Sequence, residues 1–265
     1  MRAFSALLAL SCTAVFAQLG RPPVPSASDR SFLVGFQSFG PDLTGHFQGV
    51  QDGQPIAVDL DADLGLGKDK TTPGVFLAYE GPRFGLQLSS GTAEYAGDKV
   101  LTRDITVNGT TYTATDRVLS HVKLASVEGT WTIKLVRNQA AFLGLDLGVQ
   151  SWKLDMDVHD QPTAPQTPTS ASTSVTAPIP QVGLSGAVKG FQDRVEARAF
   201  FHYLGYKSAK YTRSGLDLRL FPLPWLGLRI FLDNGTFDVP KGSIQDDLEL
   251  KLDRKGGGFG VVVRF

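Results

Sequence analysis

Residues 256–265 read Gly-Gly-Gly-Phe-Gly-Val-Val-Val-Arg-Phe and close the sequence. In an extended strand successive side chains point to opposite faces, so Phe259, Val261, Val263 and Phe265 share one face. The other face carries glycines, Val262 and Arg264. An apolar stripe ending on phenylalanine is typical of a strand that closes a membrane barrel and shows lipid its outer face. An edge strand of a soluble sandwich is the alternative for this segment alone.

Residues 143–150 show the same division more sharply. Leu143, Leu145, Leu147 and Val149 alternate with Gly144, Asp146, Gly148 and Gln150. One face is wholly aliphatic and the other is polar or minimal, which is typical of a strand with lipid outside and a polar lumen inside. A soluble barrel of the lipocalin type would have the opposite arrangement.

The same alternation, together with the turn residues between the alternating segments, predicts ten strands in the chain. We expect them at about 31–39, 72–80, 84–107, 111–135, from 143 onward, 180–190, 195–203, 213–220, 226–233 and 256–265. The fold class is therefore all-β, a single antiparallel up-and-down transmembrane barrel over residues 30–265, with eight or twelve strands as the other possible counts. Asn108-Gly109 is the strongest hairpin signal, since both residues tolerate the positive φ angles of a type I′ turn.

The predicted connections alternate in length. Short turns are expected at 81–83, 136–139, 192–194 and 222–224, and long loops at 40–70, 159–178 and 239–255. Outer-membrane barrels have tight periplasmic turns and long external loops, so this alternation favours a membrane barrel with both ends of the chain on the periplasmic side.

The composition agrees with one β domain. The 265 residues are 42% hydrophobic with a mean hydropathy near zero, too polar for a bundle of membrane helices. Lysine and arginine number 26, as do aspartate and glutamate, so the charge gives no indication of nucleic-acid binding.

Residues 1–17 have the features of a cleaved secretory signal: Arg2, an apolar run from Ala3 to Phe16, and Ala17 at the cleavage site. Residues 18–29 are proline-rich and are expected to form a flexible lead-in. The only cysteine, Cys12, lies in the leader, so we expect no disulfide and no cysteine chemistry; acylation of Cys12 in a lipoprotein is the alternative. The predicted destination is the bacterial outer membrane.

Charged residues repeatedly fall on the face that carries the glycines. We expect them to pair across a narrow lumen as a polar network made of Glu196, Arg198, His202, Asp217, Arg219, Arg229 and Asp233. Such a network favours a lumen filled by side chains.

Several stretches resemble a group of Gram-negative outer-membrane proteins, the small barrels similar to OmpA and OmpW. The stretches that resemble this group are 58–66, 177–184, Gly205-Tyr206, 216–219, 226–229 and 257–265. The chain has Gly257-Gly258 where the group shows Gly-Pro. The group has no agreed activity, so the resemblance implies a fold and a location only.

Catalysis and metal binding have weak support in the sequence. Phe201-His202-Tyr203 is similar to the motif of an outer-membrane lipid A deacylase, but the serine that this family places two residues after the histidine is Leu204 here. The four histidines have no metal-ligand spacing. Asp59, Asp61, Asp63 and Asp69 suggest calcium, yet the EF-hand positions for glycine and glutamate hold Leu64 and Lys70, so a segment folded over the barrel rim is preferred. We therefore expect no catalytic residues, no metal and no cofactor.

The expected function is a non-enzymatic structural or interaction barrel with an occluded lumen. A narrow passive channel is the alternative, and an enzyme that modifies lipid A is the third possibility. The expected partners are outer-membrane lipid or lipopolysaccharide, a possible protein partner, and the barrel-assembly machinery, which would recognise Phe259, Val261, Val263 and Phe265.

Overall fold

The computed structural model describes residues 30–51, 54–161, 168–206, 208–241 and 249–265. Every regular element in these ranges is a strand, and they belong to one antiparallel sheet. The strands are β1 (Ser31–Phe39), β2 (Asp42–Gln51), β3 (Gln54–Asp59), β4 (Gly67–Thr72), β5 (Gly74–Glu80), β6 (Phe84–Val100), β7 (Ile105–Val107), β8 (Thr110–Tyr112), β9 (Arg117–Arg137), β10 (Ala141–Asp160), β11 (Ser170–Gly190), β12 (Val195–Tyr206), β13 (Ala209–Leu220), β14 (Leu226–Val239) and β15 (Glu249–Arg264). No helix in the described part of the chain is long and apolar enough to cross a membrane.

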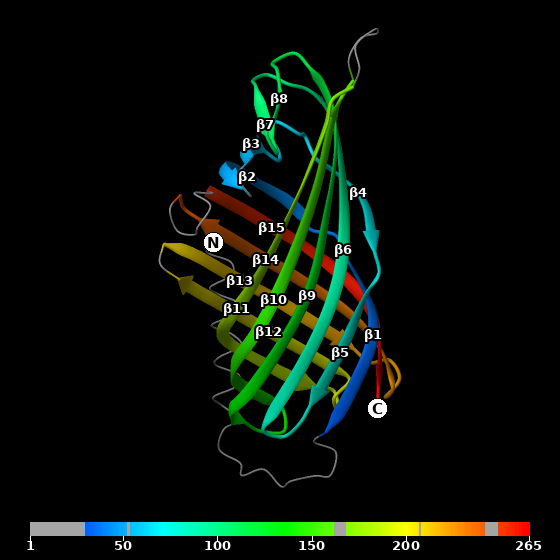
Figure 1. Ribbon diagram of the computed structural model, residues 1–265. Helices are drawn as coiled ribbons and strands as arrows, with labels where there is room; N and C mark the ends of the chain where they lie inside the picture. The colour runs from blue at the N-terminus through cyan, green and yellow to red at the C-terminus, as the bar shows by residue number, and fades with distance from the viewer. Residues whose placement is uncertain (1–29, 52–53, 162–167, 207, 242–248) are drawn as a thin grey trace, which may run out of the picture.

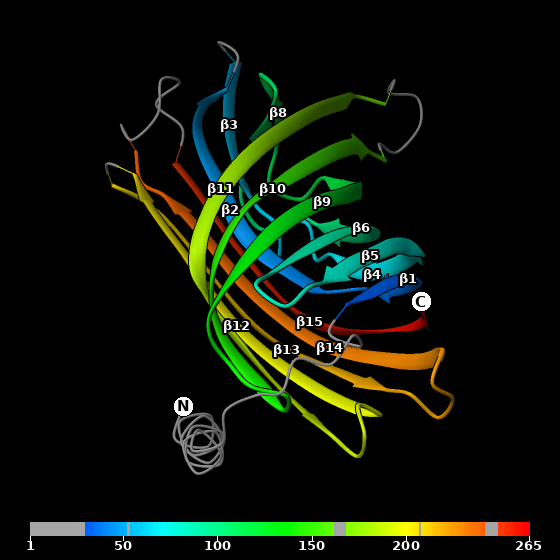
Figure 2. The same ribbon diagram turned by 90° about the horizontal axis from the view of Figure 1, so that it is seen from below.

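The wall of the molecule is a closed ring of ten strands, as predicted (Figures 1 and 2). Two of the ten are interrupted: β1 continues into β2 past Gly40-Pro41, and β4 continues into β5 past Pro73. The other eight are β6 and β9 to β15. The ring closes where β1 pairs with β15, from Leu33 opposite Arg264 to Phe39 opposite Gly258. The predicted closing strand therefore does close the barrel.

The half of the barrel near the short turns is apolar outside and polar inside. On β14, for example, Leu228, Ile230 and Leu232 are exposed, whereas Arg229 and Asp233 are buried. The outward stripe of the closing strand behaves in the same way, because Phe259 and Phe265 are exposed while Val262 is fully buried. This half has the surface of a transmembrane barrel, and we call it the membrane half.

The chemistry of the two faces is reversed in the other half. On β10 the inward positions continue as Trp152, Leu154, Met156 and Val158, all buried, while the outward positions become Lys153, Asp155, Asp157 and His159. The strand keeps its alternation, but the apolar residues move from the outer face to the inner one. A wall that is polar outside and apolar inside belongs in water, so we call this half the outer half. Figure 1 shows β9, β10 and β11 extending furthest into it.

An apolar plug fills the outer half. It is one cluster of buried residues contributed by the inner faces of the wall strands, by the turn after β3 and by the β7–β8 hairpin. Leu60 and Leu64 from the turn are completely buried in it. The predicted hairpin at Asn108-Gly109 is confirmed, with φ angles of 47° and 78°, and Tyr112 of its second strand donates a hydrogen bond to the carbonyl oxygen of Val158 at 2.9 Å.

The predicted long loops are wrong in extent. Residues 40–70 contain β2, β3 and the start of β4; β10 runs to Asp160 and β11 starts at Ser170; and β15 starts at Glu249. Likewise, residues 101–116 form a separate small hairpin between β6 and β9 rather than parts of two long strands. The reason is physical. Strands that continue past the membrane have polar outer faces, so the serine- and threonine-rich residues 170–178 resemble a loop although they belong to β11.

The short turns agree with prediction, since the wall strands at that end are joined at 81–83, 138–140, 191–194 and 221–225. The turn after β11 is unusual because Phe191, Gln192 and Asp193 all have positive φ angles, between 52° and 62°. Arg264 holds this turn in place by donating to the carbonyl oxygen of Asp193 at 3.0 Å. The predicted signal and lead-in, residues 1–29, lie outside the described residues.

Candidate functional site

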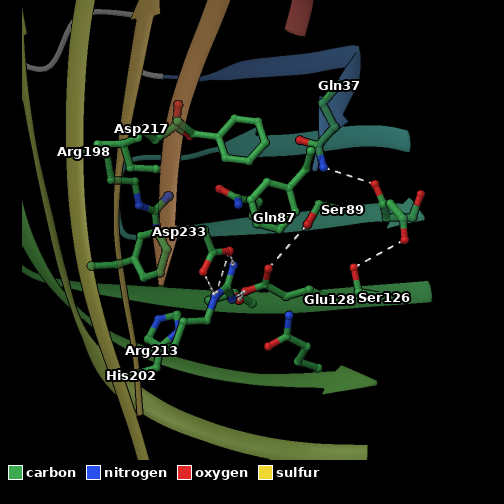
Figure 3. A pocket seen from close by; sticks show the side chains of 18 of the residues that line it. Gln37, Gln87, Ser89, Ser126, Glu128, Arg198, His202, Arg213, Asp217 and Asp233 are labelled. Carbon is green, nitrogen blue, oxygen red and sulfur yellow. Dashed lines mark hydrogen bonds and ion pairs between the residues drawn. The ribbon is translucent and has the colours of Figure 1, made fainter. Parts of the chain in front are cut away.

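The main concentration of chemistry in the described residues is a belt of charged side chains inside the membrane half, which we call the polar belt. The structure brings all seven predicted lumen residues into it, and each is at most 5% exposed. They project from three neighbouring strands, β12, β13 and β14, because these positions share the inward phase of the alternation. Figure 3 shows how several of them converge.

Asp217 is the centre of the first group. Its carboxylate accepts hydrogen bonds from Nη2 of Arg219 and from Nε of Arg229, both at 3.0 Å. Arg219 and Arg229 lie opposite each other on β13 and β14, so without Asp217 their like charges would face each other. Arg219, which is completely buried, also donates to Glu196 at 3.2 Å.

Asp233 is the centre of the second group. Arg213 binds it through two parallel hydrogen bonds, Nε to Oδ1 at 2.9 Å and Nη2 to Oδ2 at 2.6 Å. Arg254 adds a third bond to Asp233 at 3.1 Å, and Arg213 also pairs with Glu128. The forked geometry of arginine suits it to such shared carboxylates.

Asp146 connects the third group. It accepts hydrogen bonds from Thr132 at 2.6 Å and Ser185 at 2.8 Å, and it lies 3.0 Å from Nε2 of His202. Arg198 completes this group, because its Nη2 donates to Thr132 at 2.7 Å. Another carboxylate, Glu80, lies 3.0 Å from Nζ of Lys134 and 3.5 Å from Arg198.

Aromatic rings pack against the guanidinium groups of several arginines in the belt. Arg229 lies over Phe76 at 4.0 Å and over Phe231 at 4.4 Å, and Arg213 lies over Phe200 at 4.9 Å. Such stacking excludes water from one side of each guanidinium and adds a cation–π attraction. The belt is therefore a packed layer of side chains.

His202 apart, the charges of the belt balance. Its acidic members are Glu80, Glu128, Asp146, Glu196, Asp217 and Asp233, and its basic members are Lys134, Arg198, Arg213, Arg219, Arg229 and Arg254, six of each. A small cavity of about 50 Å³ remains among them. Because an unpaired buried charge is costly, neutrality is what allows this layer to be buried.

Sequence reasoning selected only part of this belt. Arg213 and Asp146 lie on the predicted polar faces but were not assigned to the network, and Glu128 lies on a strand whose inner face was not read. Arg254 falls in a stretch predicted to be a loop. Glu80 and Lys134, which pair with each other, also belong to the belt and were not assigned to the network. Continuing the alternation through whole strands would have found all six.

The neighbours of His202 differ from those that the deacylase motif requires. The position two residues after His202 is Leu204, and Nε2 of its imidazole lies 3.0 Å from the carboxylate of Asp146. Among the described residues no group of three or more histidines, cysteines, aspartates or glutamates is arranged to hold a metal ion. The chemistry that the belt supports is electrostatic pairing.

The acidic run after β3 has a structural role where it is described. Asp59 accepts backbone hydrogen bonds from Asp61 at 2.9 Å and Ala62 at 2.7 Å. Asp63 accepts from the backbone of Asp59 and pairs with Arg103, Nε to Oδ1 at 2.9 Å. These bonds shape the turn that carries Leu60 and Leu64 into the plug; the side chain of Asp69 lies outside the described ones.

Of the four residues predicted to be an assembly signal, three lie on the outer face of β15 and Phe265 follows directly after this strand. Phe259, Val261 and Phe265 are exposed, and Val263 is half-buried. The backbone of Phe265 exchanges two hydrogen bonds with that of Phe32, at 2.8 and 3.1 Å. The last residue is therefore part of the closure between the first and last strands.

No protein-family model matches the chain, and no curated protein matches it in sequence. The chain does match solved structures of other proteins. The outer membrane protease OmpT from Escherichia coli aligns with 91% of this chain and 99% of its own at 12% identity, with a TM-score of 0.57.

Two other similar structures are the translocator domain of the autotransporter NalP from Neisseria meningitidis and Ail, the attachment invasion locus protein of Yersinia pestis. NalP covers 100% of this chain and 97% of its own, at 9% identity and a TM-score of 0.36. Ail covers 89% and 97%, at 14% identity and a TM-score of 0.30. At 12% identity, the similarity to OmpT indicates a shared architecture and nothing about activity. The chain has the fold of an outer-membrane β-barrel protein.

Proposed function

We propose that this chain is an integral protein of the bacterial outer membrane that acts as a closed structural or interaction barrel. The exposed aliphatic and aromatic band around the membrane half supports the location, because such a surface is unfavourable in water and matches the hydrocarbon layer. The outer half would project from the membrane and present its polar outer face to lipopolysaccharide or to a protein partner.

One observation carries the proposal of closure: the lumen is blocked at two levels in series. The polar belt fills the membrane half with paired side chains, and the apolar plug fills the outer half. An ion crossing the barrel would have to break several buried salt bridges and then enter an apolar core. This arrangement supports a barrel with no conducting path over the alternative of a passive channel.

Planar-bilayer recording tests the closure. We expect the folded wild-type protein to give no more current than the same protein added in unfolded form, which controls for leakage on insertion. Steady, reproducible single-channel steps that appear only with the folded protein would contradict closure and support the channel alternative.

We also propose that the barrel is not an enzyme. The contact of His202 with Asp146, and Leu204 in place of a serine, support this for lipid A deacylation in particular. Mass spectrometry of lipid A from cells with and without the protein tests it. Identical acyl-chain patterns are expected, and any reproducible difference would favour the enzymatic alternative.

A further inference from the structure

We propose that the cavity in the polar belt is a binding site for small, uncharged solutes that donate and accept hydrogen bonds, and that they enter it through the side of the barrel. The entrance is a seam in the wall between β1–β2 on one side and β4–β6 on the other. This inference concerns the membrane half and does not depend on the role proposed for the outer half.

The seam exists because the backbone ladder stops there. The pairing of β1 with β5 ends at Gln37 opposite Gly74. Beyond this point β2 pairs with β15 and β3, whereas β4 pairs with β6, and no ladder joins β2 to β4 in the described residues. Figure 1 shows β2 turning away from β4 above β1. The ladder between β11 and β12 also stops, at Val182 opposite Tyr203. Among the described residues that line the cavity none belongs to β11, whereas both sides of the seam contribute to it.

Two side-chain hydrogen bonds cross the seam. Nε2 of Gln37 donates to the carbonyl oxygen of Ser90 at 3.1 Å. The hydroxyl of Tyr95 donates to the carbonyl oxygen of Pro41 at 2.6 Å. Each is a single side-chain bond, so fewer hydrogen bonds have to break at this part of the wall than between two strands joined by a continuous ladder.

The interior spaces lead to the seam. Beside the cavity of about 50 Å³ lies a second hollow of about 10 Å³, and the two share Phe39, Gly91, Ser126 and Arg254. The second hollow is also lined by Pro41 and Thr92, which belong to the two sides of the seam. The larger cavity exceeds the roughly 10–15 Å³ needed for one water molecule. Together the hollows connect the polar belt with the wall.

Gly91 lies where the two hollows meet. It lies at an inward position of β6, and a Cβ added there would meet no atom within 4 Å. Most other inward glycines of the barrel have close neighbours at that position; a Cβ on Gly183, for instance, would lie 2.1 Å from the carbonyl oxygen of Phe201. A side chain at Gly91 would therefore extend into free space between the two hollows.

The two ends of the barrel offer no other route. The apolar plug begins directly above the hollows, with Ala93, Tyr95 and Leu124 buried. At the other end a second apolar cluster, Leu33, Phe76, Ala78, Phe221 and Val262, lies beneath the completely buried Arg219. Solutes that reach the cavity must come from the side.

The seam lies where the membrane surface would be. The outward residues of β6 change there from Phe84, Leu86 and Leu88, which are all exposed, to Ser90 and Thr92. This is the border between the apolar band and the polar outer half, so the entrance faces water next to lipid headgroups.

The charge balance and the hydrogen-bonding groups around the cavity indicate which solutes it would bind. The belt is already neutral, so an added ion would be buried without compensation. The lining carries side chains that can both donate and accept hydrogen bonds, among them Gln87, Ser89 and Ser126. Such a lining favours a molecule that can do both, such as water or a small amide or alcohol.

Cysteine labelling of the full chain in lipid vesicles tests the entrance. Ser126→Cys places a thiol where the two hollows meet, and Val122→Cys places one on the same face of the same strand but inside the plug. With methyl methanethiosulfonate, a small neutral reagent, we expect Ser126→Cys to be modified and Val122→Cys not. Peptide mass spectrometry assigns each adduct, so Cys12 does not interfere.

Gly91→Leu is the blocking variant. In the Ser126→Cys background it is expected to abolish labelling, while Gly190→Leu, also at a glycine with open space around it, leaves labelling unchanged. An unreactive Ser126→Cys, or labelling that is the same with and without Gly91→Leu, would overturn the side entrance.

A charge series tests the class of solute. The cationic and anionic methanethiosulfonates, compared with the neutral one and normalised to the exposed Thr176→Cys, are both expected to label Ser126→Cys more slowly. Equal normalised rates, or a preference for one sign, would overturn the assignment to uncharged solutes even if the entrance itself stands.

Discussion

Arg219 shows how the lumen depends on complete pairing. Its guanidinium is completely buried between Glu196 and Asp217, so Arg219→Met would leave carboxylates without their partner. Breaking a buried ion pair costs about 3–5 kcal/mol. We expect a loss of that size in the free energy of unfolding, measured by denaturant titration of the protein in lipid vesicles.

Two controls accompany this change. Arg117→Ala removes an exposed partner of Asp98 and is expected to cost at most about 1 kcal/mol. The double variant Arg219→Met with Glu196→Gln is expected to lose less than Arg219→Met alone, because one unpaired charge is gone. An Arg219→Met loss no larger than that of Arg117→Ala would show that the belt does not contribute through pairing.

We expect the stability of the β7–β8 hairpin to depend on pH, because Tyr112 in its second strand has a buried hydroxyl. Burial raises the pKa of its hydroxyl to about 12, above the ordinary value of 10.0. Because the folded-state pKa is raised, the stabilisation is complete below pH 10 and is lost as the pH rises towards 12. Tyr112→Phe is expected to be less stable at neutral pH, for want of the bond to Val158, and to lose less of its remaining stability between pH 10 and 12.

Hydrogen exchange of residues 101–116 measured at several pH values checks this. A Tyr112→Phe hairpin that opens over the same pH range and to the same extent as the wild type would contradict it.

Single residues also show what the sequence could reveal. The seven lumen residues could be predicted because each occupies an inward position in a clearly alternating strand. The pairs that they form could not, since Arg254 and Glu128 are 126 residues apart and only closure of the barrel places both beside Arg213.

At the scale of elements, β15 joins the two halves of the wall. It pairs with β1 through residues 258–264 and with β2 through residues 249–255. Its ten-residue apolar end was recognisable in the sequence because period-two alternation in lipid is conspicuous. Its first part, Glu249 to Lys255, has a polar outer face and resembles a loop.

We propose that the exposed end of β15 is also the signal for barrel assembly. Deletion of Phe265 removes two backbone hydrogen bonds to Phe32 as well as an aromatic ring. We expect it to lower the fraction of protein in the outer membrane, measured by cell fractionation and by the heat-dependent gel mobility of folded barrels. Phe191→Ala, which removes a similarly exposed ring from a turn, serves as the control; equal effects of the two changes would argue against a specific signal.

The structure shows why the lengths of β10 and β11 could not be predicted from an apolar outer face alone. The signal at Trp152 to His159 is still alternation, but with the apolar residues in the inward positions. A search for one lipid-facing stripe stops at Val149. A search that keeps the phase and lets the chemistry reverse would continue to Val158.

At the scale of the whole molecule, two environments divide one continuous wall. The membrane half has its polar groups paired inside, and the outer half has its apolar groups buried inside. Ten strands, closure and short turns at one end were all predictable, because they follow from local patterns. The apolar plug was not, since it is assembled from segments that are distant in sequence.

Single-tryptophan variants in vesicles with brominated lipid acyl chains test this division most directly. Trp131 lies outward in the apolar band and is 47% exposed, whereas Trp152 lies inside the plug and is 3% exposed. With the other tryptophans replaced by phenylalanine, we predict strong quenching of Trp131 by the bromines and none of Trp152. Equal quenching of the two, or an unquenched Trp131, would contradict a barrel whose membrane half faces lipid and whose outer half is filled and stands in water.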